Sequence, residues 1–242
     1  MRLKGFLLAC LMALTLAAKS QVMWILIFGD KLSNDRIQSG INVSLASVNY
    51  TGFDESKNLF TWALGGFTDI QLNEHWSLQP EFVFKSPTGA NNLNSYFAFD
   101  TPPDSLIKDP NIYIEGTSFS LPVFIKYETK YFGLGLGPQL SLAYSTNLYL
   151  SGKTLDDATL KLKNRMGEEI NKFDYGISST LEFYLNPRKK QSSMRLGLKY
   201  YYGFGKVFKD KYTAHNSVFM ISLGIPVVSK SQLEKQQKAI EE

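Results

Sequence analysis

Residues 131–143 read YFGLGLGPQLSLA and alternate between large apolar side chains and small or polar ones. One face of this stretch would carry the apolar set, which comprises Phe132, Leu134, Leu136, Leu140 and Leu142. The other face would carry Gly133, Gly135, Gly137, Gln139 and Ser141. A period of two residues is typical of a β-strand with two chemically different faces. The glycines leave the second face almost without bulk, which suits the crowded interior of a narrow barrel.

The same alternation recurs along the chain. It covers residues 36–50, 60–72, 76–85, 117–127, 172–185, 193–204 and 217–227. Segments of about 11–15 residues reach the roughly 9–11 residues that a strand needs to cross a tilted membrane barrel wall. Short connections, at 73–75, 128–130 and 186–192, contrast with the long ones at 86–110 and 144–171. These features predict an all-β fold: an eight-stranded antiparallel up-and-down transmembrane β-barrel with short periplasmic turns and longer outside loops.

A soluble eight-stranded barrel, such as a lipocalin, would show the same alternation with its apolar face turned inward. Strand length and the glycine-rich face favour the membrane alternative, and aromatic side chains near the strand ends favour it too. One expected aromatic girdle contains Tyr127, Tyr131 and Phe132. The other contains Tyr50, Phe53, Phe60, Tyr113, Phe173 and Tyr175.

The first residues have the pattern of a secretory signal peptide. Arg2 and Lys4 precede an apolar run that is too short to span a membrane, and the small residues Ala18 and Ser20 are at positions −3 and −1 of a cleavage point after Ser20. We therefore expect a signal peptide at 1–20, a periplasmic lead-in segment at 21–35, a barrel at 36–228 and a polar tail at 229–242. The apolar stretch 22–28 is an alternative ninth strand. The expected location is the outer membrane of a Gram-negative bacterium, reached through a cleaved signal peptide.

Charge and cysteine content exclude several classes of function. The net charge of +4 includes Arg2, Lys4 and Lys19, so cleavage after Ser20 lowers it to +1 and removes the support for nucleic-acid binding. The single cysteine, Cys10, lies in the same segment, so the mature chain would have neither a disulfide nor a thiolate metal site. No phosphate-binding loop or nucleotide fingerprint occurs, and we expect no cofactor.

Several motifs resemble those of the PorT-like outer-membrane β-barrel proteins of Bacteroidota. The most specific is Leu72-Asn73 followed by Trp76-Ser77-Leu78-Gln79-Pro80-Glu81. Three further matches are residues 27–32 (IFGDKL), residues 119–122 (FSLP) running into Lys126-Tyr127, and the glycine-rich residues 133–138. The resemblance covers most of residues 21–228. It implies a small barrel with periplasmic termini, and it suggests a role in protein export of the type IX kind.

The face expected to point inward carries both signs of charge. Its acids are Asp69, Glu81, Asp174 and Glu182, and its bases are Lys85, Lys126, Arg195 and Lys199. Because buried charges must pair, we interpret this set as a salt-bridged network that fills the lumen. The alternative interpretation is an ion or small-solute path. The long segment 144–171 also mixes acids with Lys153, Lys161, Lys163 and Arg165, which predicts a solvated mixed surface.

The two histidines are expected at opposite ends of the barrel. His75 lies in a short turn, whereas His215 lies two residues before Ser217, on the same face of one strand. An outer-leaflet lipid hydrolase using His215 and Ser217 is therefore one alternative function, and a narrow channel is another. The favoured hypothesis is a non-enzymatic structural or accessory component. Its expected partners are outer-membrane lipid and lipopolysaccharide and other cell-envelope or secretion proteins.

Overall fold

The computed structural model describes residues 36–99, 107–187, 193–209 and 212–227. Within them lie nine β-strands: β1 (Ile37–Thr51), β2 (Leu59–Gln71), β3 (Trp76–Ala90), β4 (Ile107–Glu128), β5 (Phe132–Thr154), β6 (Thr159–Arg165), β7 (Phe173–Tyr184), β8 (Arg195–Gly203) and β9 (His215–Pro226). No helix in this part of the chain is both long and apolar enough to span a membrane. The predicted signal peptide, lead-in segment and tail lie outside the described residues.

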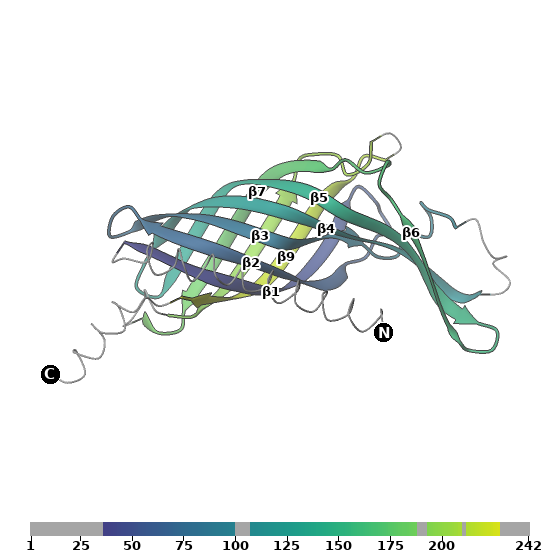
Figure 1. The fold of residues 1–242 in the computed structure, drawn as a ribbon, viewed down its shortest axis with the longest axis horizontal. Coiled ribbons are helices and arrows are strands. Elements are labelled where there is room, and N and C mark those ends of the chain that lie inside the picture. Colours follow the sequence, from purple (N-terminus) through teal and green to yellow (C-terminus); the bar gives the residue numbers. More distant parts are fainter. Residues whose placement is uncertain (1–35, 100–106, 188–192, 210–211, 228–242) are drawn as a thin grey trace, which may run out of the picture.

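The strands form one antiparallel sheet that closes on itself (Figure 1). The sheet order is β4-β3-β2-β1-β9-β8-β7-β5-β6, and a further pairing of β4 with β5 completes the barrel. Eight strands therefore make the ring, and β6 pairs only with the outer part of β5. The prediction of an eight-stranded up-and-down barrel is confirmed, and β6 is a ninth strand that it lacked.

Polar side chains fill the interior of the barrel, and apolar side chains cover its exterior. On β5, Leu134 and Leu136 are each 56% exposed, whereas Gly133 and Gly135 are buried. On β4, Ile125 is 57% exposed and its neighbour Lys126 is completely buried. This distribution is the reverse of that in a soluble barrel and is typical of a barrel whose exterior faces lipid.

Strands β4 and β5 are much longer than the sequence predicted, because parts of the stretches 86–110 and 144–171 are strands instead of loops. Their alternation continues beyond the membrane with the opposite chemistry. In this outer part the apolar side chains of Ile112, Ile114 and Leu148 point inward and are buried, while Tyr113 is turned outward. The outward apolar pattern therefore ends at the membrane edge, whereas the strands themselves continue beyond it.

The inward apolar residues belong to a hydrophobic core that lies beneath the loops opposite the short turns. Its buried members are Tyr50, Phe53, Ala90, Leu93, Ile107, Ile112, Ile114, Leu148, Leu150, Met166, Ile170, Val207, Phe208 and Ala214. We call this group the outer cap. Tyr50 and Phe53 are 1% and 5% exposed, so their assignment to an aromatic girdle was wrong. Phe60, Phe173 and Tyr175 are exposed, as that assignment required.

A β-bulge in β3 corrects the position of Lys85. The residue opposite Leu64 is Lys85, but the residue opposite Gly65 is Val83, so the register shifts between them. The extra residue turns Lys85 to the outer face, where its ammonium lies 3.3 Å from the centre of the Trp62 ring. Lys85 is therefore not a lumen residue, and Ser86 is buried after the bulge instead.

Candidate functional site

The candidate site is a network of buried charged side chains at the end of the lumen near the short turns. It draws Asp69 from β2, Glu81 from β3, Lys126 from β4, Glu182 from β7, and Arg195 and Lys199 from β8. These six were all predicted for the lumen from strand alternation. Strand pairing brings them together because each occupies an inward position in its own strand.

Lys126 is at the centre of the network and is completely buried. Its ammonium lies 2.8 Å from Glu182 Oε2, 3.0 Å from Glu128 Oε1 and 3.2 Å from Asp69 Oδ2. It also donates a hydrogen bond of 2.6 Å to Gln79 Oε1. One ammonium therefore joins acids from three different strands.

Arg195, on β8, binds two of these acids. Its Nη1 atom lies 2.7 Å from Asp69 Oδ2 and 3.4 Å from Glu182 Oε2, and Nη2 donates to the side-chain oxygen of Gln38. The guanidinium also lies 4.8 Å from the centre of the Phe67 ring. A planar guanidinium with several donors suits such a site, because it can serve several acceptors at once.

Gln79 links two parts of the network. Its amide nitrogen donates to Glu81 Oε1 at 2.7 Å and to Glu182 Oε1 at 3.0 Å, while its oxygen accepts from Lys126 and Arg195. Lys199 completes the second part with an ion pair of 2.6 Å to Glu81 Oε1. The neutral amide thus connects the Lys199–Glu81 pair to the larger cluster.

Sequence reasoning missed three groups of this network. Gln79 is uncharged and did not enter a set chosen by charge. Glu128 was assigned to a turn, but it is the last residue of β4, is buried, and accepts a hydrogen bond of 2.8 Å from the Tyr184 hydroxyl. Tyr184 was also missed, although its inward position follows from the alternation of β7 and could have been found that way.

Asp174 is buried but lies apart from the network. Its carboxylate accepts hydrogen bonds from Tyr201 Oη at 2.8 Å, Asn216 Nδ2 at 2.8 Å and the Gly205 backbone amide at 3.1 Å. It lines a cavity of about 20 Å³, which has room for one water. The predicted pairing of Asp174 with a lumen base is therefore wrong, because neutral donors hold this carboxylate instead.

The buried charges of the described residues are unequal in number. The acids are Asp69, Glu81, Glu128, Asp174 and Glu182, and the bases are Lys126, Arg195 and Lys199. The predicted balance of four against four does not hold, because Lys85 lies outside and Glu128 lies inside. Gln38, Asp69 and Arg195 each have a side-chain atom without a hydrogen-bond partner and line a cavity of about 40 Å³ that can hold water.

His215 and Ser217 are on the same face of β9, as predicted, but each contacts another group. The Ser217 hydroxyl lies 3.1 Å from the Tyr200 hydroxyl, and His215 Nδ1 lies 3.0 Å from the Gly205 carbonyl oxygen. His75 lies between β2 and β3, with its ring centre 5.7 Å from that of Tyr127. Among the described residues, no group of three or more His, Cys, Asp or Glu side chains could hold a metal ion.

Comparisons with known proteins agree with this architecture. Residues 28–209 match a family model described as an outer membrane protein beta-barrel domain. No curated protein sequence matches the chain. One similar solved structure is Ail, the attachment invasion locus protein of Yersinia pestis, with 14% identity, coverage of 81% of this chain and 100% of Ail, and a TM-score of 0.40.

Two further solved structures are similar at the same level. Neisserial surface protein A has 10% identity, covers 78% of this chain and 96% of its own, and gives a TM-score of 0.38. OprG from Pseudomonas aeruginosa has 11% identity, covers 80% and 95%, and gives a TM-score of 0.31.

Proposed function

The chain belongs to the family of outer-membrane proteins with a β-barrel domain, and from this premise we propose that it is a closed, non-enzymatic barrel. We propose for it a structural or accessory role in protein export across the cell envelope. The partners in this proposal are outer-membrane lipid and lipopolysaccharide, and a cell-envelope or secretion protein.

The observation that carries the proposal is the filling of the barrel. Near the short turns, Lys126 and Arg195 join acids from facing walls. At the other end, the outer cap closes the space beneath the loops. The two cavities lined by buried acids measure about 20 and 40 Å³, which is room for a few waters. A lumen filled in this way favours a scaffold over a solute path.

The outer extension supports a docking role for that scaffold. The outer parts of β4 and β5, together with β6, form a three-stranded sheet that projects beyond the ring (Figure 1). At its tip, Leu155 is 55% exposed between Thr154 and Asp156. A sheet that projects beyond the barrel offers a surface that a protein partner can reach. The resemblance to PorT-like proteins supports export as the process.

Crosslinking in intact outer membranes tests this proposal. A photo-crosslinking residue at Leu155 is expected to capture a cell-envelope or secretion protein, which is identified after pull-down. The same residue at Leu136, on the lipid-facing wall, is the matched control and is expected to capture lipid. The docking role is refuted if the photo-crosslinking residue at position 155 captures no protein beyond those captured from position 136.

The contacts of His215 and Ser217 favour the non-enzymatic part of the proposal. Each is engaged with a group outside the pair, as described above. Purified protein is expected to release no fatty acid from phospholipid. Hydrolysis that is lost on His215→Ala would instead establish the lipid hydrolase.

A further inference from the structure

The barrel wall divides where β5 exchanges one partner for another. Strand β5 pairs with β7 as far as Leu142, which lies opposite Phe173. From Asn147 onward it pairs with β6, beginning opposite Arg165. The chain between β6 and β7 spans the gap, with hydrogen bonds from the Met166 amide to Thr146 and from the Ala143 amide to Lys172. We call this position the fork.

A crevice of about 550 Å³ lies at the fork, which is a typical volume for a ligand site. It is lined by Leu142, Ala143, Tyr144, Ser145, Thr146, Arg165, Met166, Gly167, Glu168, Ile170 and Lys172. Two cations, Arg165 and Lys172, and one carboxylate, Glu168, share this lining with four large apolar or aromatic side chains. The crevice therefore combines an apolar surface with a net positive one.

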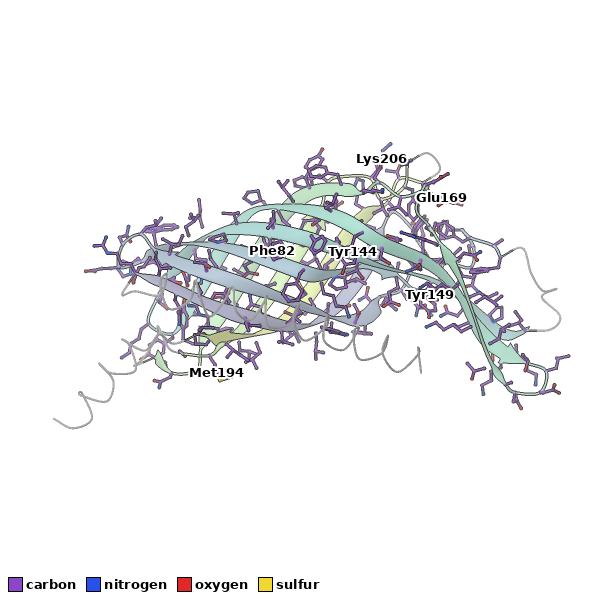
Figure 2. All side chains as sticks on the ribbon, viewed as in Figure 1. Phe82, Tyr144, Tyr149, Glu169, Met194 and Lys206 are labelled. Carbon is purple, nitrogen blue, oxygen red and sulfur yellow. The ribbon has the colours of Figure 1, made fainter. Side chains whose placement is uncertain are left out.

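The crevice lies at the outer edge of the lipid-facing surface. Leu142, which lines the crevice, and its pairing partner Phe173 are 51% and 55% exposed on that surface. Tyr144 packs on Phe119 with ring centres 4.7 Å apart, and Figure 2 shows Tyr144 on the outer wall between Phe82 and Tyr149. Aromatic side chains of this kind mark the level of the lipid head groups. The apolar lining thus borders hydrocarbon, and the cations lie at head-group level.

The positive charge continues from the crevice along β6. Lys161, Lys163 and Arg165 alternate along the strand, so their side chains share one face at intervals of about 7 Å. Lys161 and Lys163 lie 4.6 and 5.8 Å from the centre of the Tyr149 ring. A hydrogen bond to the Tyr113 side chain raises the pKa of Lys161 above its ordinary value. Glu115 also contributes a carboxylate close to this row.

We propose that the crevice at the fork binds the phosphorylated head group of an outer-leaflet lipid. Arg165 and Lys172 hold a phosphate, and Lys163 extends the contact to a second anionic group. The apolar side of the crevice, at Leu142 and Tyr144, holds the part of the lipid where the head joins its acyl chains. A free inorganic anion would leave this apolar side without a contact, whereas a lipid fills both sides of the crevice. The occupant is therefore a lipid. This inference rests on the lipid partner of the proposed function and does not depend on the export role.

Native mass spectrometry of the full-length barrel in detergent tests the site, with diphosphoryl lipid A as the probe. The Arg165→Gln/Lys172→Gln variant is expected to bind the probe at least about tenfold more weakly, because charge-assisted hydrogen bonds are lost. The matched control, Lys108→Gln/Lys153→Gln, removes the same charge at the distal end of the projecting sheet, where these two residues pair. It is expected to change the affinity less than about twofold.

Two further arms identify the occupant. Lipid A without its phosphates is expected to bind the unaltered protein as weakly as the diphosphoryl form binds the Arg165→Gln/Lys172→Gln variant. Inorganic phosphate at millimolar concentration is expected not to displace diphosphoryl lipid A. Equal weakening in both double variants would overturn the proposal in favour of diffuse surface charge, and displacement by inorganic phosphate would make it a free-anion site. Mobility on unboiled gels verifies that both variants fold.

Discussion

At the scale of single residues, each interior charge is stabilised by the partners within reach of its side chain, and not by an equal total number of acids and bases. Lys126 has carboxylates from three strands within 3.2 Å, whereas Lys199 depends on Glu81. Breaking a buried ion pair is costly, because the remaining charge keeps its desolvation penalty without its partner. Replacing one carboxylate therefore leaves Lys126 with two partners, whereas replacing Glu81 removes the carboxylate partner of Lys199.

Substitution of Glu81 measures this dependence. Glu81→Ala leaves the Lys199 ammonium buried without its carboxylate, so we expect a loss of roughly 3–5 kcal/mol in the free energy of unfolding in urea. Glu81→Gln keeps hydrogen-bonding groups and is expected to cost less. The control is Lys85→Ala on the outer face of the same strand, with an expected loss of about 0.5–1 kcal/mol from its contact with Trp62. Equal effects of Glu81→Ala and Lys85→Ala would contradict the buried pairing.

At the scale of elements, the two faces of β5 differ in the space that they offer. Leu136 is 56% exposed on the lipid-facing side. A Cβ atom at Gly135 would lie 2.6 Å from Lys126 Cγ and 2.8 Å from Thr180 Cγ2. Substitutions at these adjacent positions must therefore fail for different reasons.

Arginine scanning of β5 separates these reasons. Leu136→Arg places a charge near the middle of the bilayer and is expected to cost roughly 2–4 kcal/mol, whereas Phe132→Arg, on the same face at the end of the strand, is expected to cost about 0–1 kcal/mol. Gly135→Arg is expected to prevent folding, because the interior has no volume for it. Refolding into liposomes, followed by urea unfolding, measures all three. A well-folded Gly135→Arg protein would reverse the inside and outside assignments of the strand.

The projecting sheet provides a second test at this scale. Because β6 pairs only with β5, deleting residues 151–161 and joining Leu150 to Leu162 by an Asn-Gly turn leaves the ring intact. The shortened protein is expected to refold with the same shift between boiled and unboiled gel samples. Loss of that shift would show that the projecting sheet is needed for barrel closure.

Alternation along each strand predicted the ring and the inward position of seven of the eight charges assigned to the lumen, because every second residue of a strand faces the same side. Six of these seven form the network, and Asp174 lies apart from it. The alternation failed where the period or the chemistry changed. The bulge at Val83–Lys85 adds a residue to β3, and nothing in the sequence of residues 82–85 (FVFK) predicts it. Ile112 and Leu148 follow the same alternation and point inward, but inward residues are apolar here and polar within the membrane. The reason is that beyond the membrane the interior of the protein is apolar and its surroundings are water.

At the scale of the whole molecule, the exterior determines where the protein resides. A continuous apolar surface on all sides of the ring requires lipid, and the polar interior requires closure of the sheet. The protein is expected to fractionate with outer membranes and to migrate differently on gels when unboiled. Recovery in the soluble periplasmic fraction would contradict the lipid-facing assignment. Sequencing of the N-terminus of the exported protein tests the predicted cleavage after Ser20.

The filled lumen leads to an expectation about conduction. Because ion pairs close one end and the outer cap closes the other, purified protein in a planar bilayer is expected to show no resolved conductance steps. Lys126→Ala/Glu182→Ala removes a central pair and is the variant in which leakage is most expected. Well-resolved steps in the unaltered protein would favour the narrow channel instead.

The position of β6 outside the ring has a consequence for how related sequences diverge. The number of strands in the ring and their stagger depend on the pairings of the other eight strands, and the turn between Thr154 and Thr159 contributes to neither. Insertions and deletions in homologues are therefore expected to gather at residues 155–158, whereas the lengths of the wall segments stay fixed. Because this segment lies at the tip of the projecting sheet, related strains are expected to differ there without any change to the barrel beneath.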